Sequence, residues 1–79
     1  MERDAIVDGV RKVIKTNLDL RELPGLKEKI IQDLGADSLD QVEIVMMLED
    51  DFDISISDDE FYKADTVEDL VNLVEEKLK

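Results

Sequence analysis

Apolar residues near the start of the chain recur at the spacing of one helix face. The positions are Ile6, Val10, Val13 and Ile14, which stand at i, i+4, i+7 and i+8. This 3.6-residue period predicts an amphipathic helix over residues 4–17. The end of the chain repeats the period at Val67, Leu70, Val71, Val74 and Leu78. It predicts a last helix that starts at Asp65 or Thr66.

Two further helices are expected between these. Apolar spacing over residues 26–34 predicts a short helical turn that Gly35 ends, after a loop marked by Pro24-Gly25. A second helix should run from about Ser38 to Asp51, capped by Asp37 or Ser38, and Ser38-x-x-Gln41 fits the capping-box pattern. The sequence predicts a loop over residues 53–57 and a short third helix over residues 58–63.

These elements predict an all-α fold. We expect one domain over residues 1–79, a four-helix bundle with a short third helix and a long loop between helices one and two.

The helix expected at 38–51 carries two apolar faces. Ile44, Val45, Leu48 and Phe52 gather on one side and form the natural core stripe. Leu39, Val42 and Met46 gather on roughly the opposite side, with Glu43, Glu49 and Asp50 among or beside them. The second stripe could pack under the long loop. Its acidic surroundings and the adjacent Ser38 favour a docking surface for partners with basic rims.

The composition of the chain limits the functions that it can have. The net charge is −12, and no Lys or Arg occurs from Ile30 through Tyr62, where there are eleven Asp or Glu. This charge argues against nucleic-acid binding and predicts basic partners. Without Cys or His, the chain has no thiol and lacks the commonest general base. No signal peptide or membrane span is evident, so a soluble, cytoplasmic protein is expected.

Ser38 has two interpretations from its position alone. It can be a helix cap, a role that serine often takes and that contributes roughly 1 kcal/mol. It can also be an attachment point for a group that another enzyme adds. A hydrolase nucleophile is excluded, because the chain has no His base and no Gly-x-Ser-x-Gly elbow.

The residues around Ser38 favour attachment. The run Asp33-Leu34-Gly35-Ala36-Asp37-Ser38-Leu39-Asp40 resembles the phosphopantetheine attachment motif of acyl carrier proteins, with Asp37 and Leu39 as the flanking motif residues. The segments Val42-Glu43-Ile44-Val45-Met46 and Leu48-Glu49-Asp50-Asp51-Phe52 are similar to that family's second helix. The resemblance covers residues 30–79 well and the first helix in pattern only.

The resemblance implies a carrier that catalyses nothing itself. A separate transferase would use coenzyme A and a divalent metal to place 4′-phosphopantetheine on Ser38, and the prosthetic thiol would carry acyl groups as thioesters. Partner enzymes of fatty-acid synthesis would meet the acidic residues through Arg and Lys, with the apolar residues at the centre of the contact. The docking residues so implied are Leu39, Val42, Glu43, Met46, Glu49 and Asp50. The protein would be monomeric, and its interior could shelter a short acyl chain.

The third helix departs from the family pattern. Fatty-acid-type carriers commonly read Ile-Pro-Asp-Glu-Glu-Ala-Glu-Lys-Ile where this chain has Ile56 to Ala64. A small residue has become Phe61 and a large one has become Ala64. We expect Phe61 to turn inward and take space that the family gives to position 64, whereas the alternative has Phe61 exposed and Tyr62 inside.

Three rival functions remain open at this point. One is a carrier for polyketide, lipid A or amino-acyl transfer, which the altered third helix favours. Another is an unmodified acidic regulatory module. The third is a calcium-responsive protein, because Asp51-x-Asp53-x-Ser55 matches the opening of an EF-hand loop. That loop, however, has Ile56 where glycine is needed and Tyr62 where a bidentate Glu is needed, so no specific metal site is expected.

Overall fold

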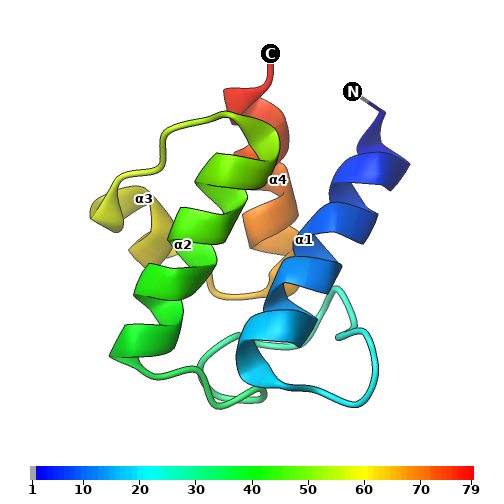
Figure 1. Ribbon diagram of the computed structural model, residues 1–79, viewed down its shortest axis with the longest axis vertical. Coiled ribbons are helices and arrows are strands. Elements are labelled where there is room, and N and C mark those ends of the chain that lie inside the picture. The colour runs from blue at the N-terminus through cyan, green and yellow to red at the C-terminus, as the bar shows by residue number, and fades with distance from the viewer. Residues whose placement is uncertain (1) are drawn as a thin grey trace.

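The structure is a computed structural model that describes residues 2–79, and within them it contains four helices and no strand. The helices are α1 (Arg3–Leu18), α2 (Ser38–Phe52), α3 (Asp58–Lys63) and α4 (Val67–Lys77). α1 packs against both α2 and α4, and it runs antiparallel to them, while the short α3 lies beside α2 (Figure 1). This confirms the predicted all-α bundle with a short third helix and a long first loop.

The helix ends lie close to the predicted ones because local capping signals fix them. Thr66 starts α4 with a capping box in which its hydroxyl accepts from Asp69 N–H at 3.1 Å. Ser57 starts α3 in the same way, accepting from Glu60 N–H at 3.2 Å. Each box satisfies backbone donors that have no partner within the helix.

The long loop between α1 and α2 is fastened to the start of α4. Backbone hydrogen bonds join Ile30 N–H to Asp65 O, Val67 N–H to Glu28 O and Glu68 N–H to Leu26 O, at 2.8–3.0 Å. The predicted helical turn over residues 26–34 forms as successive hydrogen-bonded turns rather than an α-helix. Gly35 follows at φ +75°, a conformation that glycine adopts without steric cost.

The core uses the apolar positions that the helical period selected. Every member of the α1 stripe is buried, as are Ile44, Leu48 and Phe52 of α2 and Val67, Leu70, Val71 and Val74 of α4. Val45 is half-buried. Within residues 2–79, no helix has the length and apolar character needed to cross a membrane.

Candidate functional site

Ser38 is the first residue of α2, at the end of the bundle where the long loop lies (Figure 1). The helix cap is Asp37, whose extended backbone lets its carboxylate accept from Asp40 N–H at 2.9 Å. The Asp40 carboxylate accepts from Asp37 N–H at 3.0 Å in return. The capping box predicted for Ser38 and Gln41 is therefore wrong, since Asp37 and Asp40 form it one position earlier. Because Asp37 does the capping, the exposed Ser38 hydroxyl remains available.

A small hollow opens beside Ser38 between α2 and α3. Its volume is about 190 Å³. Its lining is Ser38, Gln41, Val42, Val45, Asp58, Phe61 and Tyr62. We call it the Ser38 pocket. Most of its wall is apolar or aromatic, so it suits an aliphatic group better than a charged one.

Phe61 and Tyr62 face opposite ways on α3. Phe61 is 4% exposed and belongs to the buried core, whereas Tyr62 is 81% exposed. This confirms the expectation that Phe61 turns inward, and it excludes the reverse arrangement. The Ser38 pocket consequently has a buried ring on its inner side and an exposed ring on its outer side.

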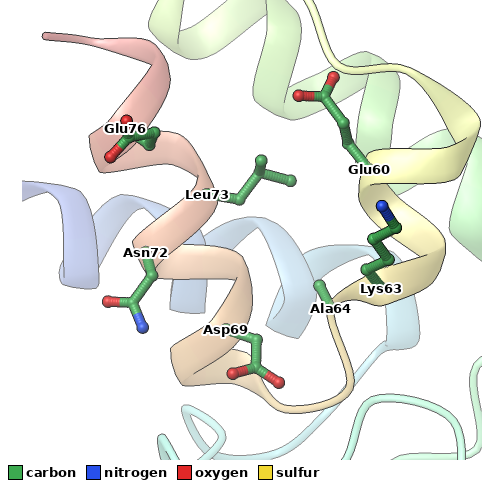
Figure 2. A pocket seen from close by; sticks show the side chains of 7 residues that line it. All are labelled: Glu60, Lys63, Ala64, Asp69, Asn72, Leu73 and Glu76. Atoms are coloured by element: carbon green, nitrogen blue, oxygen red, sulfur yellow. The ribbon is translucent and has the colours of Figure 1, made fainter.

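Ala64 lines a different hollow from Phe61. This groove of about 430 Å³ lies between α3 and α4, and Figure 2 shows Leu73 reaching into it from α4. Its lining is Glu60, Lys63, Ala64, Asp69, Asn72, Leu73 and Glu76. The expectation that Phe61 occupies space left by position 64 stays a prediction, since Phe61 belongs to the buried core cluster and Ala64 packs against that same cluster. Phe61 lines the Ser38 pocket together with residues of α2. Ala64 directly follows α3 and lines the α3–α4 groove together with residues of α4.

An ion pair joins Glu60, one of the residues of this groove, to Lys77 of α4. Lys77 Nζ lies 2.6 Å from Glu60 Oε2. The Lys77 side chain, followed by the Ser57 backbone N–H, lowers the pKa of Glu60 from its ordinary 4.5 to about 2. Asp69 on α4 also has a lowered pKa, chiefly because the Thr66 backbone N–H donates to its carboxylate. These carboxylates are therefore ionised at neutral pH and stabilise the helix starts.

The second apolar face of α2 is exposed, as the interpretation of this face as a docking surface predicts. Leu39 is 66%, Val42 54% and Met46 61% exposed. The alternative, in which these residues pack under the long loop, is excluded by this exposure. We call Leu39, Val42 and Met46 the α2 apolar face.

The acidic residues around this face are not equivalent. Glu43 and Asp50 are exposed. Glu49 is half-buried, and its carboxylate accepts a hydrogen bond from Ile56 N–H at 2.8 Å. Glu49 thus holds the loop before α3 in place, a role that the sequence pattern did not indicate. Within residues 2–79 no group of three or more Asp, Glu, His or Cys side chains is arranged to hold a metal ion.

Comparison with known proteins shows which family this sequence resembles. The sequence model of a family described as "Phosphopantetheine attachment site" matches residues 8–74. A Campylobacter lari protein named acyl carrier protein is 49% identical over 72 residues, which cover 90% of this chain and 94% of the relative. Proteins of the same name from Phenylobacterium zucineum and Buchnera aphidicola are 45% and 41% identical, covering 92% and 91% of this chain and 94% and 91% of theirs.

Proposed function

Because the chain belongs to the acyl carrier protein family, we propose that Ser38 is the residue that bears its 4′-phosphopantetheine arm. The observation that carries this proposal is the free, exposed hydroxyl at the first position of α2, with the helix cap supplied by Asp37. When bound, the arm supplies the thiol that this Cys-free chain lacks and on which acyl groups travel as thioesters.

The residues around Ser38 fit such a group. The exposed hydroxyl can be reached by a transferase, which joins its oxygen to the pantetheine phosphate of coenzyme A and releases adenosine 3′,5′-bisphosphate. The Ser38 pocket offers apolar wall at Val42 and Val45 directly beside the attachment point. No further side chain of this protein is required for the chemistry, so the protein acts as a carrier and not as an enzyme.

Fatty-acid synthesis by separate enzymes is the setting that fits this family. The partners we propose are a phosphopantetheinyl transferase and acyl-transfer enzymes with basic docking patches. We take residues 1–79 as one carrier domain that acts as a monomer, and we place it in the cytoplasm because its arm derives from coenzyme A. A specialised carrier is the second candidate, favoured by the buried ring of Phe61 beside the attachment serine.

The attachment site is tested by intact mass after incubation with coenzyme A, magnesium and a transferase. Wild-type protein should gain the mass of one phosphopantetheine, and Ser38→Ala should gain nothing. Since Asp37 is the cap, Ser38→Ala should change the free energy of unfolding by less than about 0.5 kcal/mol.

Ser57→Ala is the matched control. Ser57 caps α3 with its hydroxyl, so this variant should load normally and lose about 1 kcal/mol of stability. Equal loading of Ser38→Ala and wild type would refute the proposed site, as would wild-type protein that gains no mass.

The docking face is tested by reversing charge beside it. Glu43→Lys and Asp50→Lys should each lower the transferase kcat/KM by roughly twofold to fivefold, the effect of losing an exposed ion pair. The loss should shrink at high salt, where exposed charges are screened.

Glu22→Lys serves as the control, because Glu22 is an exposed residue of the long loop and the change in net charge is the same. Circular dichroism checks that each variant folds. If Glu22→Lys slows the transferase as much as Glu43→Lys does, the effect comes from net charge and α2 is not the docking face.

A further inference from the structure

Two sulfur-containing side chains stand next to each other on α2. The chain has no Cys and three methionines, of which Met46 and Met47 belong to this helix. Without a thiol in the chain, methionine is its most readily oxidised side chain, and the sulfoxide that forms can be reduced back by an enzyme. The effect of such oxidation depends on where each sulfur lies.

The two methionines have different surroundings. Met46 is exposed and belongs to the α2 apolar face. Met47 is half-buried and packs against the core. Its Sδ accepts a hydrogen bond at 2.7 Å from Nδ2 of Asn17 on α1, the helix beside α2 (Figure 1). This hydrogen bond occupies a sulfur lone pair that an oxidant would need. Met46 is therefore the sulfur that is open to attack from solvent.

Carboxylates beside Met46 limit the kind of oxidant. Glu49 and Asp50 line the same surface hollow as the two methionines, with a volume of about 310 Å³. These carboxylates, together with the net charge of −12, repel anions from this part of the surface. An uncharged oxidant such as hydrogen peroxide reaches Met46 more readily than an anionic one.

We propose that Met46 is a site of reversible oxidation by an uncharged peroxide, and that its sulfoxide blocks docking on the α2 apolar face. This inference rests on the proposed docking of partner enzymes there. In the reaction a lone pair of Met46 Sδ attacks one peroxide oxygen, an S–O bond forms and the O–O bond breaks. The released hydroxide takes up the remaining proton as water. The sulfur loses two electrons, which the peroxide gains.

The added oxygen changes the docking face because it turns an apolar thioether into a polar group. A partner that covers the α2 apolar face must then remove water from this oxygen, which costs free energy unless the partner supplies a hydrogen bond. The transferase kcat/KM should therefore fall by roughly tenfold. The bundle should stay folded, since Met46 is not part of the buried core.

The first measurement locates the oxidation. Wild-type protein without the arm is treated with hydrogen peroxide and desalted, and peptide mapping by mass spectrometry then finds the added oxygen. Met46 should be oxidised before Met47. This result does not depend on attachment at Ser38.

The second measurement compares transferase kcat/KM before and after the treatment. The treated wild type should lose roughly tenfold, and a methionine sulfoxide reductase with a thiol reductant should restore the rate. Normal loading of the untreated protein separates this inference from the attachment proposal. Circular dichroism checks that the treated protein is folded.

Two variants assign the effect to one sulfur, and each is compared with its own untreated form. Met46→Leu removes the exposed sulfur, so peroxide should leave its kcat/KM unchanged. Met47→Leu is the matched control on the same helix, and peroxide should lower its kcat/KM as much as that of wild type.

Three results would overturn the inference. Oxidation of Met47 before Met46 would show that the hydrogen bond from Asn17 and partial burial give no protection. A treated wild type that carries the sulfoxide at Met46 and is loaded as fast as before would show that the sulfoxide does not block docking. An equal loss in treated Met46→Leu would place the effect on another group.

Discussion

At the level of single residues, Asp37 and Ser38 have separate roles at the start of α2, although serine is also a common helix cap. Asp37 caps α2 through its carboxylate, and Ser38 keeps an exposed hydroxyl. The sequence allowed either residue as the cap, because both types are favoured at that position. The choice depends on the backbone: Asp37 is extended, whereas Ser38 is already helical. The sequence alone therefore could not decide which of the two residues caps α2.

The other end of α2 has a residue in an unfavourable place. Asp53 follows the helix at φ 54°, and the last turn of α2 has no basic residue. Its carboxylate therefore lies at the negative end of the helix dipole. Asp53→Asn should raise the free energy of unfolding by about 0.5 kcal/mol, because Asn tolerates this backbone conformation and removes the charge. Urea unfolding measures the change.

Asp19→Asn provides the comparison. Asp19 ends α1 at φ 53°, but α1 has Lys15 in its last turn. Lys15 already offsets part of the negative charge at this end of α1, so the free energy of unfolding should rise less for Asp19→Asn than for Asp53→Asn. An Asp53→Asn variant that is no more stable than wild type, or a larger gain at Asp19, would contradict this account.

At the level of elements, α2 shows how much a helical pattern can predict. Its spacing separated Ile44 and Leu48, which are fully buried, from the α2 apolar face, which is exposed. Spacing could not show that Glu49 binds the backbone of Ile56, because that contact depends on how the chain turns after α2. Nor could it show that Phe61 and Ala64 line separate hollows, since i and i+3 residues often lie on one face.

An ion pair between Glu60 and Lys77 links the short α3 to α4. Glu60 has a folded-state pKa of about 2, below its ordinary 4.5, so the unfolded chain binds the proton more readily. Its contribution is therefore fully present above pH 4.5 and is lost as the pH falls toward 2. Glu60→Gln keeps the capping box with Ser57 but removes the charge. This variant should have a lower urea midpoint than wild type at pH 7. The difference should disappear as the pH falls from 4.5 toward 2.

Glu76→Gln is a matched control on α4, where the glutamate is exposed and its contact with Lys79 is 3.7 Å. Its urea midpoint should follow that of wild type at each pH. A constant difference between Glu60→Gln and wild type from pH 7 to pH 2 would show that the ion pair does not contribute. Added salt should reduce the Glu60 effect, because both partners are partly exposed.

At the level of the whole molecule, negative charge opposes the compact state. The net charge of −12 is concentrated between Ile30 and Tyr62, where there is no basic residue. Self-repulsion of this kind is relieved by screening. Raising sodium chloride from low to moderate concentration should therefore raise Tm by about 5 °C, which corresponds to roughly 1 kcal/mol for a domain of this size.

Magnesium chloride at equal ionic strength separates screening from cation binding. Equal increases in Tm with the two salts would indicate screening alone. A larger increase with magnesium chloride would indicate that the cation also binds. A Tm that stays flat or falls with sodium chloride would contradict the repulsion account. The sequence alone supported this prediction, since net charge does not depend on the fold.

The fold was predictable because it depends on local signals, and the proposal of Ser38 as the attachment residue rests on an equally local one. Helical periods, capping residues such as Thr66 and the eight-residue run around Ser38 all lie within short segments. The fastening of the long loop to α4 was not predictable, since its hydrogen bonds join residues such as Ile30 and Asp65 that are far apart in the chain. The shape of the Ser38 pocket depends on the same kind of long-range packing.

The central claim is that the arm is attached to Ser38. The chain offers two other serines, Ser55 and Ser57, both exposed. Fragmentation of the loaded wild-type protein in a mass spectrometer locates the added phosphopantetheine directly. We predict that every fragment containing Ser38 carries the added mass and that fragments containing only Ser55 and Ser57 do not. Added mass on a fragment that lacks Ser38 would contradict the account.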